Sequence, residues 1–218
     1  MDKKILNNKL IYLIIIIVFS FLFNYHYANL GVFPIDTFAF FDTAYNILLD
    51  RHPFKDIWVT TGPLVDYLQS FFFKIFGLKW SSYVIHSSFI NSLISLIFFT
   101  TLVNFKLDKL LSFFYAIGLG TLCYTISGTP FAYIHSYVFS LLSVLLFFNG
   151  ILLRSKKYFF FLPITMSLAF LSMQNPSTFV NFVIAVMISI YFFKKENREY
   201  IVYFLGGSLT IIIFFFGF

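Results

Sequence analysis

A chain of 218 residues that is 60% hydrophobic and only 11% charged has the composition of an integral membrane protein rather than a soluble domain. Its net charge of +6 does not indicate nucleic-acid binding, because the basic residues lie in small groups at the ends of apolar runs, where they set membrane topology. The single cysteine, Cys123, excludes a disulfide framework within the chain. We therefore predict one all-α, polytopic membrane domain over residues 1–218.

Seven apolar runs are candidates for membrane-spanning helices. They cover residues 10–32, 80–105, 110–126, 133–153 and 158–173, a run that ends at Phe193, and a run that begins near Tyr200. Gln174 and Asn175 lie between the fifth and sixth runs, and they are either a polar turn or a discontinuous pair that lines a cavity. The last run reaches Phe218 without a polar tail, so we expect a truncated or split chain.

The basic residues predict the orientation of the chain. If the N-terminus lies in the cytoplasm, eleven of the fifteen lysines and arginines are cytoplasmic. The four on the outer side are Arg51, Lys55, Lys74 and Lys79. We therefore expect a multi-pass protein of the inner (cytoplasmic) membrane, with an extracytoplasmic loop over residues 31–79.

This loop holds five of the nine acidic residues and two predicted interfacial helices. The first helix covers residues 37–50, and the second begins at Gly62 and Pro63 and ends at Gly77. On the first helix the polar and apolar side chains separate into two sectors. The polar sector contains Asp36, Asp42, Thr43, Asn46 and Asp50, and the apolar sector contains Phe38, Phe41, Tyr45, Leu48 and Leu49.

The five acids of the loop have different interpretations. Asp36 occupies an N-cap position, so on the residues alone a helix cap and a catalytic base are equally open. Asp66 is interpreted as a solvated acid that suits the N-terminus of the second helix. Asp50 and Asp56 are interpreted as partners of Arg51 and Lys55 in surface ion pairs.

Several short stretches of the loop follow one another in a characteristic order. They are Pro-x-Asp ending at Asp36, His-Pro-Phe-Lys-Asp at residues 52–56, Thr-Gly-Pro-Leu-Val-Asp-Tyr-Leu at residues 61–68, and Phe-Lys-Ile-Phe-Gly at residues 73–77. After a basic start and one span, this order resembles the first outer loop of GT-C membrane glycosyltransferases, the superfamily of protein O-mannosyltransferases and aminoarabinose transferases. Residues 168–175 and the charged turn before Tyr200 resemble the middle of bacterial members. The resemblance covers only the N-terminal part of a typical member.

Enzymes of this superfamily transfer a sugar from a polyprenyl-phosphate carrier to a glycan, lipid or protein acceptor outside the membrane. The resemblance implies that an acid just after the first span is the catalytic base, and Asp36 occupies that place. Many members have a second acid directly after it, whereas this chain has Thr37, so Asp42 is our candidate for the second carboxylate.

The departing lipid phosphate requires positive charge nearby. Lys55, Lys74 and His135 are candidates, as is a divalent cation such as Mg²⁺ or Mn²⁺ held by Asp36 and Asp42. For His135 the alternative is amphipathic filler at the membrane interface. The four histidines show no i,i+4 pair, so a zinc site has little support.

The competing interpretation is a non-catalytic membrane protein. One form is an inactive remnant that serves as the partner subunit of a transferase, and the other is a translocator of lipid-linked sugars. A carrier is expected to place ionisable groups in the middle of its spans, and these spans contain almost none. The remnant interpretation stays open, because a chain that ends at Phe218 would lack half of the cavity expected of such an enzyme. A second chain would then have to supply the missing spans.

Overall fold

The computed structural model describes residues 9–32, 36–125 and 127–216 of the chain, with side chains as far as residue 213. Nine α-helices and one short 3₁₀ helix lie within these ranges, and the protein is all-α as predicted. Four helices are long and apolar enough to cross a membrane: α2 (Lys9–Tyr27), α5 (Trp80–Asn104), α7 (Ala132–Leu153) and α9 (Gln174–Phe193). The helices divide into two compact units that meet in sequence between Ile134 and His135, and each unit is described by itself.

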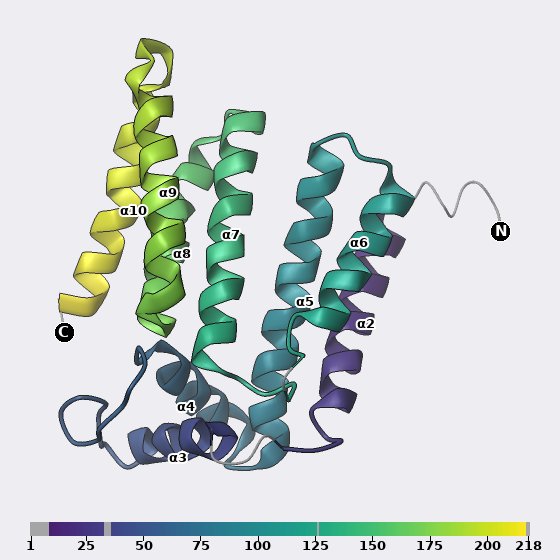
Figure 1. Cartoon of the computed structure of the whole chain (residues 1–218), viewed down its shortest axis with the longest axis vertical. Helices are drawn as coiled ribbons and strands as arrows, with labels where there is room; N and C mark the ends of the chain where they lie inside the picture. The colour runs from purple at the N-terminus through teal and green to yellow at the C-terminus, as the bar shows by residue number, and fades with distance from the viewer. Residues whose placement is uncertain (1–8, 33–35, 126, 217–218) are drawn as a thin grey trace. The chain divides into compact units, whose positions relative to one another are not determined.

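The first unit consists of three upright helices and two short ones (Figure 1). Helices α2, α5 and α6 (Lys109–Leu122) pack on one another, and α3 (Asp36–Leu48) packs on α4 (Leu64–Phe76), which also contacts α5. Figure 1 shows α3 lying across one end of the upright group. Two short helices, α3 and α4, thus lie in the sequence between the long apolar helices α2 and α5, as predicted.

Local signals in the sequence explain where these helices begin and end. Pro63 directly precedes α4, and Gly77 ends it with a φ of 87° while its N–H donates to the carbonyl of Phe73. Asp108 caps α6 by accepting hydrogen bonds from the backbone N–H groups of Leu110 and Leu111 at 2.9 and 3.1 Å. These caps satisfy backbone groups that have no partner inside the helix.

Buried polar side chains join the upright helices of the first unit. The Asn24 amide of α2 donates to Ser87 and Ser88 of α5 and to the carbonyl of Gly128. The Asn91 amide donates to the carbonyls of Ser20 and Gly120 at 3.0 and 2.7 Å. Small residues and interhelical hydrogen bonds are the usual means of helix association in membranes, where lipid tails compete for apolar contact. We therefore assign these side chains to packing.

The second unit contains α7, α8 (Lys156–Ser172), α9 and α10 (Glu199–Phe216). Phe147, Phe159, Leu162, Ile184, Ile188 and Tyr200 form its apolar core. Helices α8 and α10 approach closely at Gly207, where an added Cβ would collide with the backbone carbonyl of Phe160. Lys156 and Glu199 form an exposed ion pair of 3.0 Å at the first turns of these two helices.

The structure corrects the predicted division of α3 into two sectors. Thr37 and Ala44 are buried against the protein, together with part of Phe41, whose ring contacts Phe73 of α4 and Tyr83 of α5. Other members of the predicted apolar sector are exposed, namely Phe38, Tyr45, Leu48 and Leu49. The helix therefore has three faces, because it packs on α4 and α5 while also keeping an apolar and a polar side outside.

Candidate functional site

Asp36 and Asp42 are exposed on α3, away from its packed face. Asp36 is the first residue of the helix. The Asp42 carboxylate accepts a hydrogen bond of 3.1 Å from the Asn46 amide, and the Asn46 amide oxygen accepts one of 3.3 Å from the guanidinium of Arg51. The structure thus connects Asp42 to a cation that the sequence patterns did not assign to the site.

The two carboxylates do not by themselves fit a divalent cation. Residues six positions apart on a helix lie about 9 Å apart along its axis and about 120° apart around it. Among the described residues there is no group of three histidine, cysteine, aspartate or glutamate side chains that could hold a metal. Hard divalent cations take six or more oxygen ligands, and two carboxylates that point in different directions cannot bind the same ion together.

The three predicted phosphate contacts have different surroundings. Lys55, in the connector between α3 and α4, and Lys74, in the last turn of α4, are both exposed. His135 is fully buried at the beginning of the second unit, with its ring 6.2 Å from that of Phe139. The two lysines are therefore accessible cations, whereas a phosphate could reach His135 only if its surroundings moved.

The connector between α3 and α4 is organised by backbone hydrogen bonds. The Asp56 carboxylate accepts the N–H of His52 at 2.9 Å, and the N–H of Phe54 donates to the carbonyl of Ile57. Neither Asp50 nor Asp56 forms an ion pair with a described residue, so the predicted surface pairs are wrong. Asp56 instead satisfies the backbone of a tight turn, which competes with pairing to a neighbouring lysine. The same turn leaves Trp58 85% exposed.

Asp66 differs most from its predicted setting. It was expected to be solvated, but it is only 1% exposed, and its Oδ1 atom has no hydrogen-bond partner in the described part of the chain. Burial raises the pKa of the Asp66 carboxyl from 3.8 to about 7. A carboxyl with this pKa is close to half protonated at neutral pH. Perturbed acids of this kind are found both in functional sites and in structural networks.

Two further polar side chains share the buried interface between α4 and α5. Gln69 is fully buried, and its amide oxygen lies 2.9 Å from Nδ1 of His86. Its amide nitrogen has no hydrogen-bond partner within residues 9–32, 36–125 and 127–213. Because an amide oxygen can only accept, His86 must carry its proton on Nδ1 in this hydrogen bond. Asp66 and Gln69 thus each keep a buried polar atom without a partner among the described residues, as does Asn91 of α5 at its amide oxygen.

The orientation of α4 follows from the membrane setting. Asp66, Gln69, Ser70 and Phe73 share the buried face, with the i, i+3, i+4, i+7 spacing of one side of a helix. Tyr67, Phe71, Ile75 and Phe76 are exposed. A polar stripe faces water in a soluble protein, but beside lipid it turns toward the protein. The apolar spacing of residues 67, 71 and 75 is the signal that could have revealed this.

No family model matches this sequence, and neither a curated protein nor a solved structure is detectably similar to it.

Proposed function

We propose that this protein is a membrane glycosyltransferase that moves a sugar from a polyprenyl-phosphate carrier to an acceptor on the extracytoplasmic side. The observation that carries the proposal is the arrangement of α3. It lies between two long apolar helices and exposes Asp36 and Asp42 beside exposed apolar residues such as Phe38 and Tyr45. Such a helix suits the membrane interface, where a lipid phosphate and a water-borne acceptor meet.

The proposed reaction needs one base and positive charge. Asp36 accepts the proton of an acceptor hydroxyl while the hydroxyl oxygen forms a bond to the anomeric carbon. The bond between that carbon and the phosphate oxygen breaks, and polyprenyl phosphate leaves with the electron pair. Arg51, Lys55 and Lys74 are the basic side chains that we assign to the negative charge of the leaving phosphate. Asp42 orients Arg51 through Asn46.

The proposal includes the fuller topology of seven spans. Helices α6, α8 and α10 would supply the three shorter crossings beside the four long apolar helices. In this orientation α3 and α4 are extracytoplasmic, and the protein belongs to the inner (cytoplasmic) membrane with its N-terminus inside. A second chain that completes the spans is part of the proposal only if the purified protein proves inactive by itself.

The test is sugar transfer by the full chain in proteoliposomes that contain a radiolabelled polyprenyl-phosphate sugar. Asp36→Asn should lower the turnover about 100- to 10,000-fold, the range expected for loss of a general base. Asp50→Asn is the matched control, since it makes the same change in charge on an exposed acid of the same loop. Asp50 has a φ of 57°, a conformation that asparagine tolerates.

Equal turnover by the Asp36→Asn variant and the unmodified protein would refute the assignment of Asp36. If the unmodified protein binds the lipid-linked sugar but transfers nothing, even with candidate partner chains present, the non-catalytic interpretation is correct. That interpretation covers both a partner subunit and a translocator, and a flip assay with a fluorescent lipid-linked sugar distinguishes the two.

A further inference from the structure

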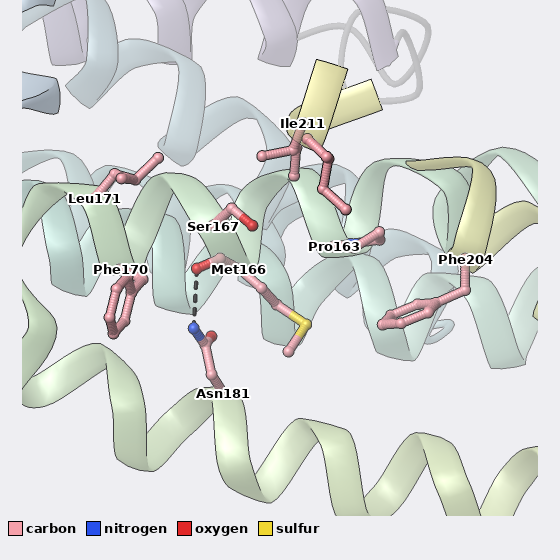
Figure 2. A pocket seen from close by; sticks show the side chains of 9 residues that line it. Pro163, Met166, Ser167, Phe170, Leu171, Asn181, Phe204 and Ile211 are labelled. Atoms are coloured by element: carbon pink, nitrogen blue, oxygen red, sulfur yellow. Dashed lines mark hydrogen bonds between the residues drawn. The ribbon is translucent and has the colours of Figure 1, made fainter. Parts of the chain in front are cut away.

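The second unit contains an apolar cavity of about 510 Å³ between α8, α9 and α10 (Figure 2). Its lining includes Pro163, Met166 and Phe170 of α8, Asn181 of α9, and Phe204 and Ile211 of α10. None of the nine residues that line it carries a charge. The cavity lies wholly within one unit and contains none of the residues assigned to glycosyl transfer.

The wall of this cavity contains a polar atom, Asn181 Oδ1, for which the described residues supply no hydrogen-bond partner. The Asn181 amide nitrogen donates to the backbone carbonyl of Met166 at 2.9 Å, which fixes the orientation of the amide group. The amide oxygen, Oδ1, is buried and accepts no hydrogen bond from any residue that the structure describes. Figure 2 shows the Met166 side chain running beside this amide. A methionine side chain is flexible enough to move aside and open access to the oxygen.

The residues that line the cavity determine which kind of ligand it can bind. An unpaired acceptor in apolar surroundings is costly, so an occupant that supplies one hydrogen-bond donor is favoured over a pure hydrocarbon. A phosphate group is disfavoured, because no basic side chain lines the cavity to balance its charge. Asn181 lies seven residues inside α9, or about 10 Å from its end, which is below the level of lipid headgroups.

The volume argues against a docked helix. One turn of a helix about 10 Å wide occupies about 400 Å³, so this cavity holds little more than a single turn. Helices that pack on one another make contact along several turns. A flexible hydrocarbon chain fits a cavity of about 510 Å³ better.

We infer that the cavity between α8, α9 and α10 binds a neutral lipid with a long apolar chain and a free hydroxyl group, which donates a hydrogen bond to Asn181 Oδ1. The chain lies against Phe170, Phe204 and Ile211. The inference does not depend on the proposed glycosyl transfer, and it holds for a non-catalytic protein as well.

The test uses a long-chain alcohol with a photoactivatable diazirine in its chain, and the methyl ether of the same alcohol, which cannot donate a hydrogen bond. Each probe is cross-linked to the full chain in lipid nanodiscs, and the labelled residues are mapped by mass spectrometry. The alcohol should label residues of this cavity about tenfold more than the ether at subsaturating concentration, the effect of one hydrogen bond.

Two variants and one internal control complete the test. Asn181→Leu should lower labelling by the alcohol to the level of the ether. Ser167→Phe fills the cavity without changing Asn181 and should lower labelling by both probes. A second groove of about 360 Å³, lined only by apolar residues of α7 and α9 such as Val144 and Val183, should be labelled equally by both probes.

Equal labelling of the α8–α10 cavity by the alcohol and the ether would overturn the inference, and it would mean that water or nothing satisfies Asn181. Labelling that persists in the Ser167→Phe variant would also overturn it. Cross-links between copies of the chain at Phe170 or Ile211 would show that a protein helix, and no lipid, covers this surface. If Asn181→Leu does not fold, the comparison of the two probes and the Ser167→Phe variant still test whether the lipid binds in this cavity.

Discussion

The stability of the contact between α4 and α5 should depend on pH through Asp66. The folded protein raises the pKa of this carboxyl from 3.8 to about 7 because the side chain is buried. Between these two values the folded state binds more protons than an open state in which Asp66 is solvated. The contact is therefore most stable below pH 4 and loses stability as pH rises through 7.

The size of the effect follows from the shift. Each pKa unit corresponds to about 1.36 kcal/mol, so the full cost of burying the ionised carboxylate is about 4 kcal/mol. Between pH 5 and pH 8 the cost changes by about 2.5 kcal/mol, or about 70-fold in the opening equilibrium of α4. The neighbouring phenols of Tyr67 and Tyr83 do not contribute over this interval, because a phenol ionises near pH 10 in water and burial raises the pKa of Tyr67 further.

The assay is amide hydrogen exchange of α4 in the full chain at pH 5 and pH 8, with Asp66→Asn compared at each pH. Asparagine has the shape of the protonated acid and cannot ionise, so the difference between the two proteins isolates Asp66 from the intrinsic pH dependence of exchange and from any pH effect of His86, which both proteins share. The unmodified protein should lose protection relative to this variant as pH rises. Identical behaviour of the two proteins, with Asp50→Asn as the exposed control, would refute the conclusion that Asp66 is buried without a counterion.

Two further predictions concern the packing and the orientation of the chain. Gly207→Ala should destabilise the second unit by about 1–3 kcal/mol in thermal unfolding, since the new Cβ meets the backbone of Phe160, whereas Gly206→Ala places its Cβ at an ordinary distance of 3.7 Å from the Phe160 ring and should have a smaller effect. Equal effects would contradict the close approach of α8 and α10. A membrane-impermeant amine reagent applied to intact cells should modify Lys55 and spare Lys157, and the reverse pattern would invert the proposed topology.

The helices could be predicted closely because their ends carry local signals. Pro63, Gly77 and Asp108 mark the start or end of a helix through backbone geometry and capping, and these effects depend on a few neighbouring residues. The long apolar helices are equally local, since length and composition alone suffice to identify them.

The surroundings of the candidate site could not be predicted in the same way. The hydrogen bond from Asn24 to Gly128 joins residues 104 positions apart, so no local sequence pattern predicts it. Asp66 was misassigned because its polar stripe was interpreted as facing water, whereas the apolar exterior of α4 turns that stripe inward. His135 was misassigned for a similar reason. The residues next to it in the sequence do not reveal that its side chain is buried.

The most direct test of the proposed function is the release of polyprenyl phosphate from a lipid-linked sugar by the Asp36→Asn and Asp50→Asn variants, measured side by side in proteoliposomes. We predict that Asp36→Asn loses at least about 100-fold in rate, as expected for removal of a general base, while Asp50→Asn stays within a few-fold of the unmodified protein. Equal rates for the two variants, at equal amounts of folded protein, would contradict catalysis by the acidic face of α3.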